Sequence, residues 1–109
     1  MTMILTTTNG VEGRPVAAYL GLVASEAIMG ANFFRDFFAS VRDVFGGRSA
    51  SYEKVFADAR AAAEAELVAK ARERGADAVI GIAVDHEVIG GDSRTILMVS
   101  MTGTAVRLG

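Results

Sequence analysis

The chain has 109 residues, 51% hydrophobic and 22% charged, so it is too apolar for intrinsic disorder and long enough for a single globular domain, predicted over residues 1–109. Eleven Lys and Arg residues against thirteen Asp and Glu residues give a formal net charge of −2, which argues against a nucleic-acid partner. Cysteine is absent and histidine occurs once, which excludes disulfides, thiolate metal sites and cysteine nucleophiles.

The N-terminal part of the chain predicts two strands and no targeting segment. A short strand is expected over residues 3–8, and a second over residues 15–27, which are rich in Val, Leu, Tyr and Ala without helical charge spacing. Residues 1–10 contain no Lys or Arg, so they lack the charged part of a secretory signal. The longest apolar run, residues 16–24, is about half the ~18 residues of a membrane-spanning helix, so we expect a cytoplasmic protein without a membrane partner.

Two helices are predicted next. Residues 32–45 carry Phe and Val at three- and four-residue spacing, with Asn32 as a capping residue and Gly46-Gly47 at the end. A second helix is expected from residue 49 or 51 to residue 74, ended by Gly75 and roughly 35 to 39 Å long. Its predicted apolar stripe consists of Tyr52, Val55, Phe56, Ala59, Ala62, Ala63 and Leu67.

The last third of the chain predicts a β-hairpin, with strands over residues 77–89 and 94–106 and a turn over residues 90–93. The order strand, strand, helix, helix, strand, strand indicates an α+β domain in which an antiparallel sheet is covered by helices on one face.

The strands of this hairpin are apolar at both odd and even positions, in residues 78–84 and 96–99, so both faces of the sheet need a cover. Either the two helices lie on opposite faces of a monomer, or another copy of the chain covers the second face. We favour the second, because burying ~400 Å² of apolar surface contributes on the order of 10 kcal/mol before the association entropy is subtracted.

His86 and its neighbours Asp85 and Glu87 are the candidates for a metal site, because imidazole and carboxylates bind divalent metals. In an extended strand the imidazole points to one face and the two carboxylates to the other, so the three cannot bind one ion unaided. We interpret His86 as a residue at a solvated strand end, unless symmetry-related copies complete a site around it.

Charged pairs in the first predicted helix are candidates for a ligand site. The pairs Arg35-Asp36 and Arg42-Asp43 recur seven residues apart. This spacing places the two Arg on one flank of the helix and the two Asp on the other. Such an arrangement is typical either of a ligand site or of a solvated charged face with ordinary ion pairs. Residues 46–49, with Arg48, could hold an anion or form a plain turn between helices. No catalytic residue is predicted, because nucleotide-binding motifs and a nucleophile-elbow sequence are missing.

Longer motifs carry a family resemblance. These motifs are residues 30–39 (GANFFRDFFA), 41–43, 46–49 and 52–53 in the first half and residues 75–82, 98–100 and 103–106 in the second. They resemble the YbjQ-like family, which is labelled as heavy-metal-binding and has no characterised function. The resemblance implies a dodecin-like α+β subunit that assembles into a ring, typically a homopentamer. The motif residues it marks as ligand or interface candidates are Asn32, Arg35, Asp36, Arg42, Asp43, Arg48, Tyr52 and Glu53.

These observations predict a homo-oligomeric, by resemblance pentameric, binding or scaffold protein that is not an enzyme and whose main partner is a second copy of itself. A divalent metal ion is the cofactor that the resemblance suggests, and without Cys it would depend on carboxylates, His86 or Met. The alternative is an enzyme or a small-anion-binding protein whose site between subunits consists of Arg and Asp residues.

Overall fold

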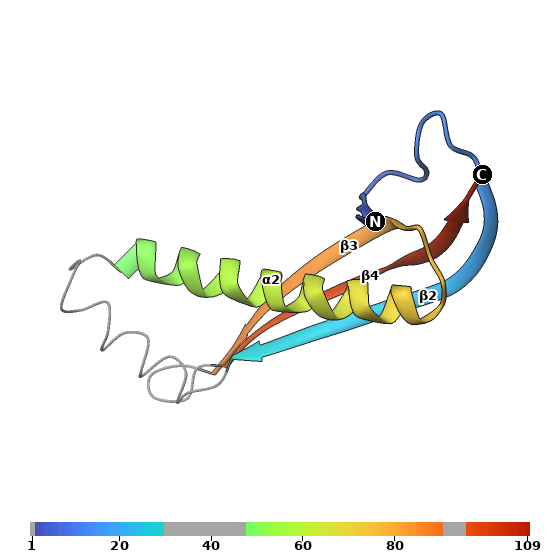
Figure 1. The fold of residues 1–109 in the computed structure, drawn as a ribbon. Coiled ribbons are helices and arrows are strands. Elements are labelled where there is room, and N and C mark those ends of the chain that lie inside the picture. Colours follow the sequence, from blue (N-terminus) through green and yellow to red (C-terminus); the bar gives the residue numbers. More distant parts are fainter. Residues whose placement is uncertain (1, 30–47, 91–95) are drawn as a thin grey trace.

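A long helix lies beside a sheet of strands in the protein (Figure 1). The computed structural model describes residues 2–29, 48–90 and 96–109, except for the side chains of residues 48–52. The helix predicted over residues 32–45 and turn residues 91–93 therefore lie outside the described part. The described elements are β1 (Ile4–Leu5), β2 (Val16–Met29), α2 (Arg48–Glu73), β3 (Ala78–Ile89) and β4 (Ile96–Leu108).

The four described strands form one mixed sheet in the order β1-β3-β4-β2. Central β4 pairs antiparallel with β2 and with β3, as the predicted hairpin requires. The α+β class is confirmed, but the prediction of an antiparallel sheet is wrong, because β1 runs parallel to β3 and pairs Ile4 with Ala78 and Leu5 with Val79. Such a short strand carries too little pattern to show its direction in the sequence.

The main core lies between α2 and the face of the sheet formed by β2 and β4. The helix buries every fourth residue, and each of these side chains is fully buried: Val55, Ala59, Ala63, Leu67 and Ala71. Ala62 of the predicted stripe is instead exposed, since the buried positions advance in steps of four. Small alanine side chains let the helix approach the sheet closely. The sheet contributes Val23, Ala27, Leu97, Val99, Met101 and Ala105 to this core.

The C-terminal end of α2 has the predicted glycine stop. Gly75 adopts φ 77°, its N–H donates to the carbonyl of Arg72, and the N–H of Ala76 donates to the carbonyl of Ala71. These two bonds form a Schellman motif, which satisfies carbonyls at the helix end and turns the chain toward β3.

A second, smaller core lies on the opposite face of the sheet, at the end where β1 joins it. Ala78, Ile80, Val106 and Leu108 are buried there, beneath Ile4, Val11 and Val16 of the N-terminal part. The N-terminal segment thus covers one end of the second face within a single chain. The sequence reasoning considered only helices or another copy as covers and missed this third one.

A β-bulge in β3 decides which side chains face α2. Ile80 pairs with Thr104 and Ala83 with Thr102, so Gly81 and Ile82 together lie opposite the single residue Gly103. Gly81 accommodates this bulge because it adopts φ 61°. The extra residue reverses the alternation: Val79 faces the helix before the bulge, and even-numbered residues face it afterwards.

Candidate functional site

His86 lies beside α2 because of this bulge. Its imidazole ring meets the ring of Phe56 edge to face, with 5.4 Å between the ring centroids and an interplanar angle of 73°. Nη1 of Arg60 lies 3.4 Å from Nε2 of His86. Since a guanidinium only donates hydrogen bonds, Nε2 of His86 is the acceptor in this contact.

These side chains line a hollow of about 290 Å³ between α2 and β3, together with Glu53. Glu53, Phe56 and Arg60 occupy positions i, i+3 and i+7 of the helix, so they share one face over two turns. We call this hollow the Arg60–His86 pocket. Its four residues bring one cation, one imidazole, one carboxylate and one aromatic ring to the same place.

Asp85 and Glu87 lie on the other face of the sheet from His86. Asp85 is paired with Ser100 and Glu87 with Met98, whereas His86 is paired with Val99 of the main core. The two carboxylates therefore do not share an ion with the imidazole. No group of three His, Cys, Asp or Glu side chains that could hold a metal ion occurs among residues 2–29, 48–90 and 96–109.

Of the remaining candidates, only Glu53 has a described side chain, and it is exposed at the Arg60–His86 pocket. Arg48 and Tyr52 lie in the first turns of α2, with their side chains outside the described part. Asn32, Arg35, Asp36, Arg42 and Asp43 also lie outside it. The sequence analysis missed Arg60. The spacing that places Arg60 on the same helix face as Glu53 and Phe56 can be read from the sequence, but the contact of Arg60 with His86 depends on the bulge in β3.

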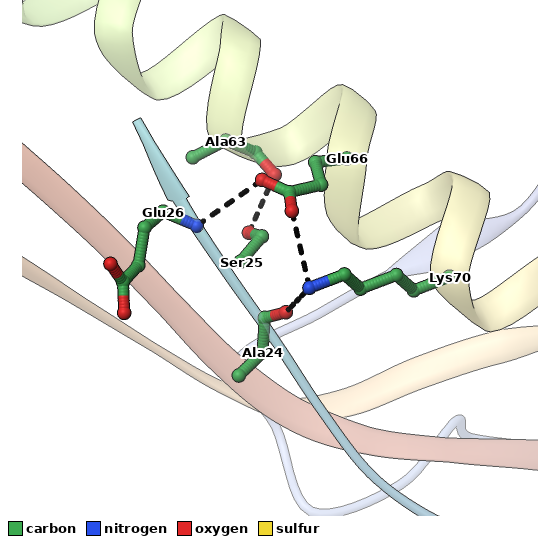
Figure 2. A network of polar contacts seen from close by, with 6 residues as sticks. All are labelled: Ala24, Ser25, Glu26, Ala63, Glu66 and Lys70. Carbon is green, nitrogen blue, oxygen red and sulfur yellow. Dashed lines mark hydrogen bonds and ion pairs between the residues drawn. The ribbon is translucent and has the colours of Figure 1, made fainter. Parts of the chain in front are cut away.

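The outer edge of β2 is closed by polar side chains of α2, as Figure 2 shows. Lys70 Nζ donates to the carbonyl of Ala24 at 2.7 Å, and the backbone N–H of Glu26 donates to Glu66 Oε2 at 3.3 Å. Lys70 and Glu66 are themselves paired at 3.1 Å. Beneath them, the buried hydroxyl of Ser25 donates to the carbonyl of Ala63 at 2.7 Å. The helix thus occupies backbone groups that an edge strand would otherwise offer to another strand.

Arg74 extends this closure toward the start of β2, where its Nη1 donates to the carbonyl of Leu20 at 3.1 Å. Gly21 leaves room for this guanidinium: it adopts φ +102°, and a Cβ added there would lie 2.9 Å from Nη1 of Arg74. The absence of a side chain at residue 21 therefore permits both the positive φ of the β2 backbone and the close approach of the Arg74 guanidinium.

The hydrogen bonds from Lys70 and from the N–H of Glu26 lower the pKa of the Glu66 carboxyl below its ordinary value of 4.5. A carboxyl whose pKa is lower in the folded state stabilises the fold above the unfolded-state pKa, and this stabilisation is lost as the pH falls through the folded-state pKa. We therefore expect the urea midpoint of the wild type to fall more steeply below pH 4.5 than that of Glu66→Gln. Glu64→Gln, two residues earlier in α2 and also exposed, is the control and should keep the wild-type profile.

The face of the sheet away from α2 carries large exposed hydrophobic side chains. Leu22 is 77% exposed and Ile28 is 61% exposed. Across the sheet, Ile28 lies level with Met98, and Ile89 is paired with Ile96. We call this surface the open face; its large exposed hydrophobic residues are Tyr19, Leu22, Ile28, Ile89 and Ile96.

The open face also carries carboxylates. Glu26 and Asp85 lie on either side of Ser100, and Glu87 is paired with Met98. The surface is therefore apolar and acidic. In the described ranges, no helix is sufficiently long and apolar to cross a membrane.

The fold, with the Arg60–His86 pocket on one face of the sheet and the open face on the other, defines a small α+β protein. Its described part has one helix packed on a four-stranded mixed sheet. The chain belongs to the YbjQ-like family, whose model carries the description "Putative heavy-metal-binding" and matches residues 3–109. It is also similar to a crystal structure at 2.73 Å resolution of a protein with unknown function, of the DUF74 family, from Pediococcus pentosaceus ATCC 25745. That similarity has a TM-score of 0.70 over 98% of each chain at 17% identity, so it shows a shared fold.

Proposed function

We propose that the protein is a homo-oligomeric binding protein in which a second copy of the chain covers the open face. The observation that carries this proposal is the set of large hydrophobic side chains exposed together on that face, among them Leu22 and Ile28. Exposed apolar surface of this kind marks interaction sites in water-soluble proteins.

The exposure of these side chains supports association. On the open face Leu22 is 77% exposed, Ile28 61%, Ile89 53% and Ile96 40%. Full burial of a Leu or Ile side chain contributes about 1.5–3 kcal/mol, so a second copy that covers several of them gains free energy of association.

The closed edge of β2 supports contact through the face rather than through strand addition. Lys70, Glu66 and Arg74 occupy backbone groups between Leu20 and Glu26, so another strand would have to displace them before it could pair there. The carboxylates of Glu26 and Asp85 divide the open face, which favours a contact centred on Ile28, Ile89 and Ile96. A ring of five copies, as the family resemblance implies, is the assembly that we expect.

Light scattering coupled to gel filtration tests this proposal. We expect a mass of about 57 kDa for five copies of the 11.4 kDa chain. The double variant Ile28→Glu/Ile89→Glu should dissociate at micromolar concentration, because each copy would bring two further carboxylates to an acidic interface. The matched control is Ala65→Glu, which adds a carboxylate to an exposed position of α2. A monomeric wild type, or a double variant with unchanged mass, contradicts the proposal.

Metal binding by one copy does not fit the described donors. Cysteine is absent, the imidazole of His86 lies beside the guanidinium of Arg60, and Asp85 and Glu87 lie on the other face. A guanidinium 3.4 Å from Nε2 of His86 repels a divalent cation. A metal site at His86 would therefore need donors from outside the described part of the chain or from another copy.

A further inference from the structure

The Arg60–His86 pocket has the chemistry of an anion site. Arg60 belongs to neither ion pair found within the described part of the chain, which join Lys54 to Asp58 and Lys70 to Glu66. Its guanidinium is therefore available to an external oxyanion. The neighbouring acids Asp85 and Glu87 project to the opposite face of the sheet, so they do not neutralise it.

The imidazole of His86 orients the guanidinium of Arg60. Nε2 of His86 lies 3.4 Å from Nη1 of Arg60, and a guanidinium only donates hydrogen bonds, so His86 accepts one of them. A guanidinium carries five N–H donors, so the others remain for an oxyanion.

The other residues of the pocket determine which kind of molecule can carry the bound anionic group. The half-buried ring of Phe56 forms an apolar wall beside His86. Glu53 lines the same hollow two helical turns, or about 10 Å, before Arg60. A carboxylate at that end repels a second negative charge, so the pocket favours a ligand with one anionic end and an uncharged apolar body.

We infer that the Arg60–His86 pocket binds a small organic monoanion, such as a carboxylate on a planar apolar ring, with Arg60 holding the oxyanion, His86 orienting the guanidinium and Phe56 holding the ring. The volume of about 290 Å³ accommodates a ligand of this size. This inference names the ligand class of the proposed binding protein, but the pocket is formed by residues of one chain. It therefore stands independently of the oligomeric state.

Ring resonances of His86 provide the test, because it is the one histidine in the chain. Titration of the full-length protein with sodium benzoate, followed by NMR, should shift these resonances with saturation, and inorganic phosphate should bind more weakly because it has no ring for Phe56. Arg60→Gln should weaken benzoate binding by at least about tenfold, because a charge-assisted hydrogen bond is lost. The control Arg72→Gln, exposed on the same helix and outside the pocket, should bind like the wild type.

Glu53→Gln separates this site from unspecific attraction to positive charge. If Glu53 excludes a second negative charge, this variant should accept terephthalate, a ring with two carboxylates, better than the wild type does. The inference is overturned if benzoate causes no saturable shift, if Arg72→Gln and Arg60→Gln weaken it equally, or if zinc chloride saturates His86 while benzoate does not. Light scattering on the same samples reports association separately, so failure of the pocket and failure of the oligomer are distinguishable.

Discussion

Leu67→Ala should destabilise the protein by about 2–5 kcal/mol, the largest effect that we expect from a single side chain in α2. Leu67 is fully buried in the main core, where it is the largest of the helix side chains with no exposure. Its neighbours along the buried stripe are Ala63 and Ala71, whose small side chains cannot move to fill the vacated space. Alanine favours the helix itself slightly, so the loss would come from the cavity and not from helix propensity.

Urea unfolding monitored by circular dichroism measures this loss at one fixed protein concentration. Val68→Ala is the matched control, because Val68 is the next residue of α2 and is only half-buried. It should cost clearly less than Leu67→Ala. Equal losses at residues 67 and 68 would show that the buried face of α2 is placed wrongly.

Gly103→Ala should destabilise the protein by about 1–3 kcal/mol, although it adds one methyl group. A Cβ at residue 103 would lie 2.6 Å from Cγ1 of Val79, 3.1 Å from Cγ1 of Ile82 and 3.2 Å from the carbonyl oxygen of Ile80. The last atom belongs to the backbone beside the β3 bulge, so it cannot rotate away. The substitution must therefore shift β3 relative to β4 or deform the bulge.

A double variant distinguishes this clash from a general weakness of β4. Val79→Ala removes the nearest atom, so Gly103→Ala/Val79→Ala should lose less stability than the sum of the two single losses. Thr102→Ala, exposed on the adjacent position of β4, should change the unfolding midpoint little. Additive losses in the double variant would contradict the steric explanation.

Much of the fold followed from local patterns. The second predicted helix, from residue 49 or 51 to residue 74, agrees with α2 to within a few residues, because its alanine-rich stripe and Gly75 are local signals. The hairpin strands were predicted to within two residues of β3 and β4. The direction of β1 and the N-terminal cover of the second core were not predicted, because both depend on contacts between residues far apart in the chain.

The candidate site was less accessible to sequence reasoning. Strand alternation separated His86 from Asp85 and Glu87 as predicted, since it depends only on extended backbone. Which of the two faces His86 would take was open, because the bulge at Gly81 reverses the alternation. An isolated glycine within a strand is a signal for such a bulge, but its effect on Arg60 appears only once α2 is placed.

The amino-acid sequence by itself determined the class of the domain, the extent of α2 and the β3–β4 hairpin, and it excluded cysteine chemistry. These properties depend on composition and on spacings of a few residues, which act through local backbone geometry. Only the tertiary structure decided that Arg60 meets His86, that α2 closes the edge of β2, and that Leu22 and Ile28 lie exposed on the face away from α2. The physical reason is that all three depend on where α2 packs on the sheet, and the first depends also on the residue inserted in β3. Both are fixed only when distant segments pack together.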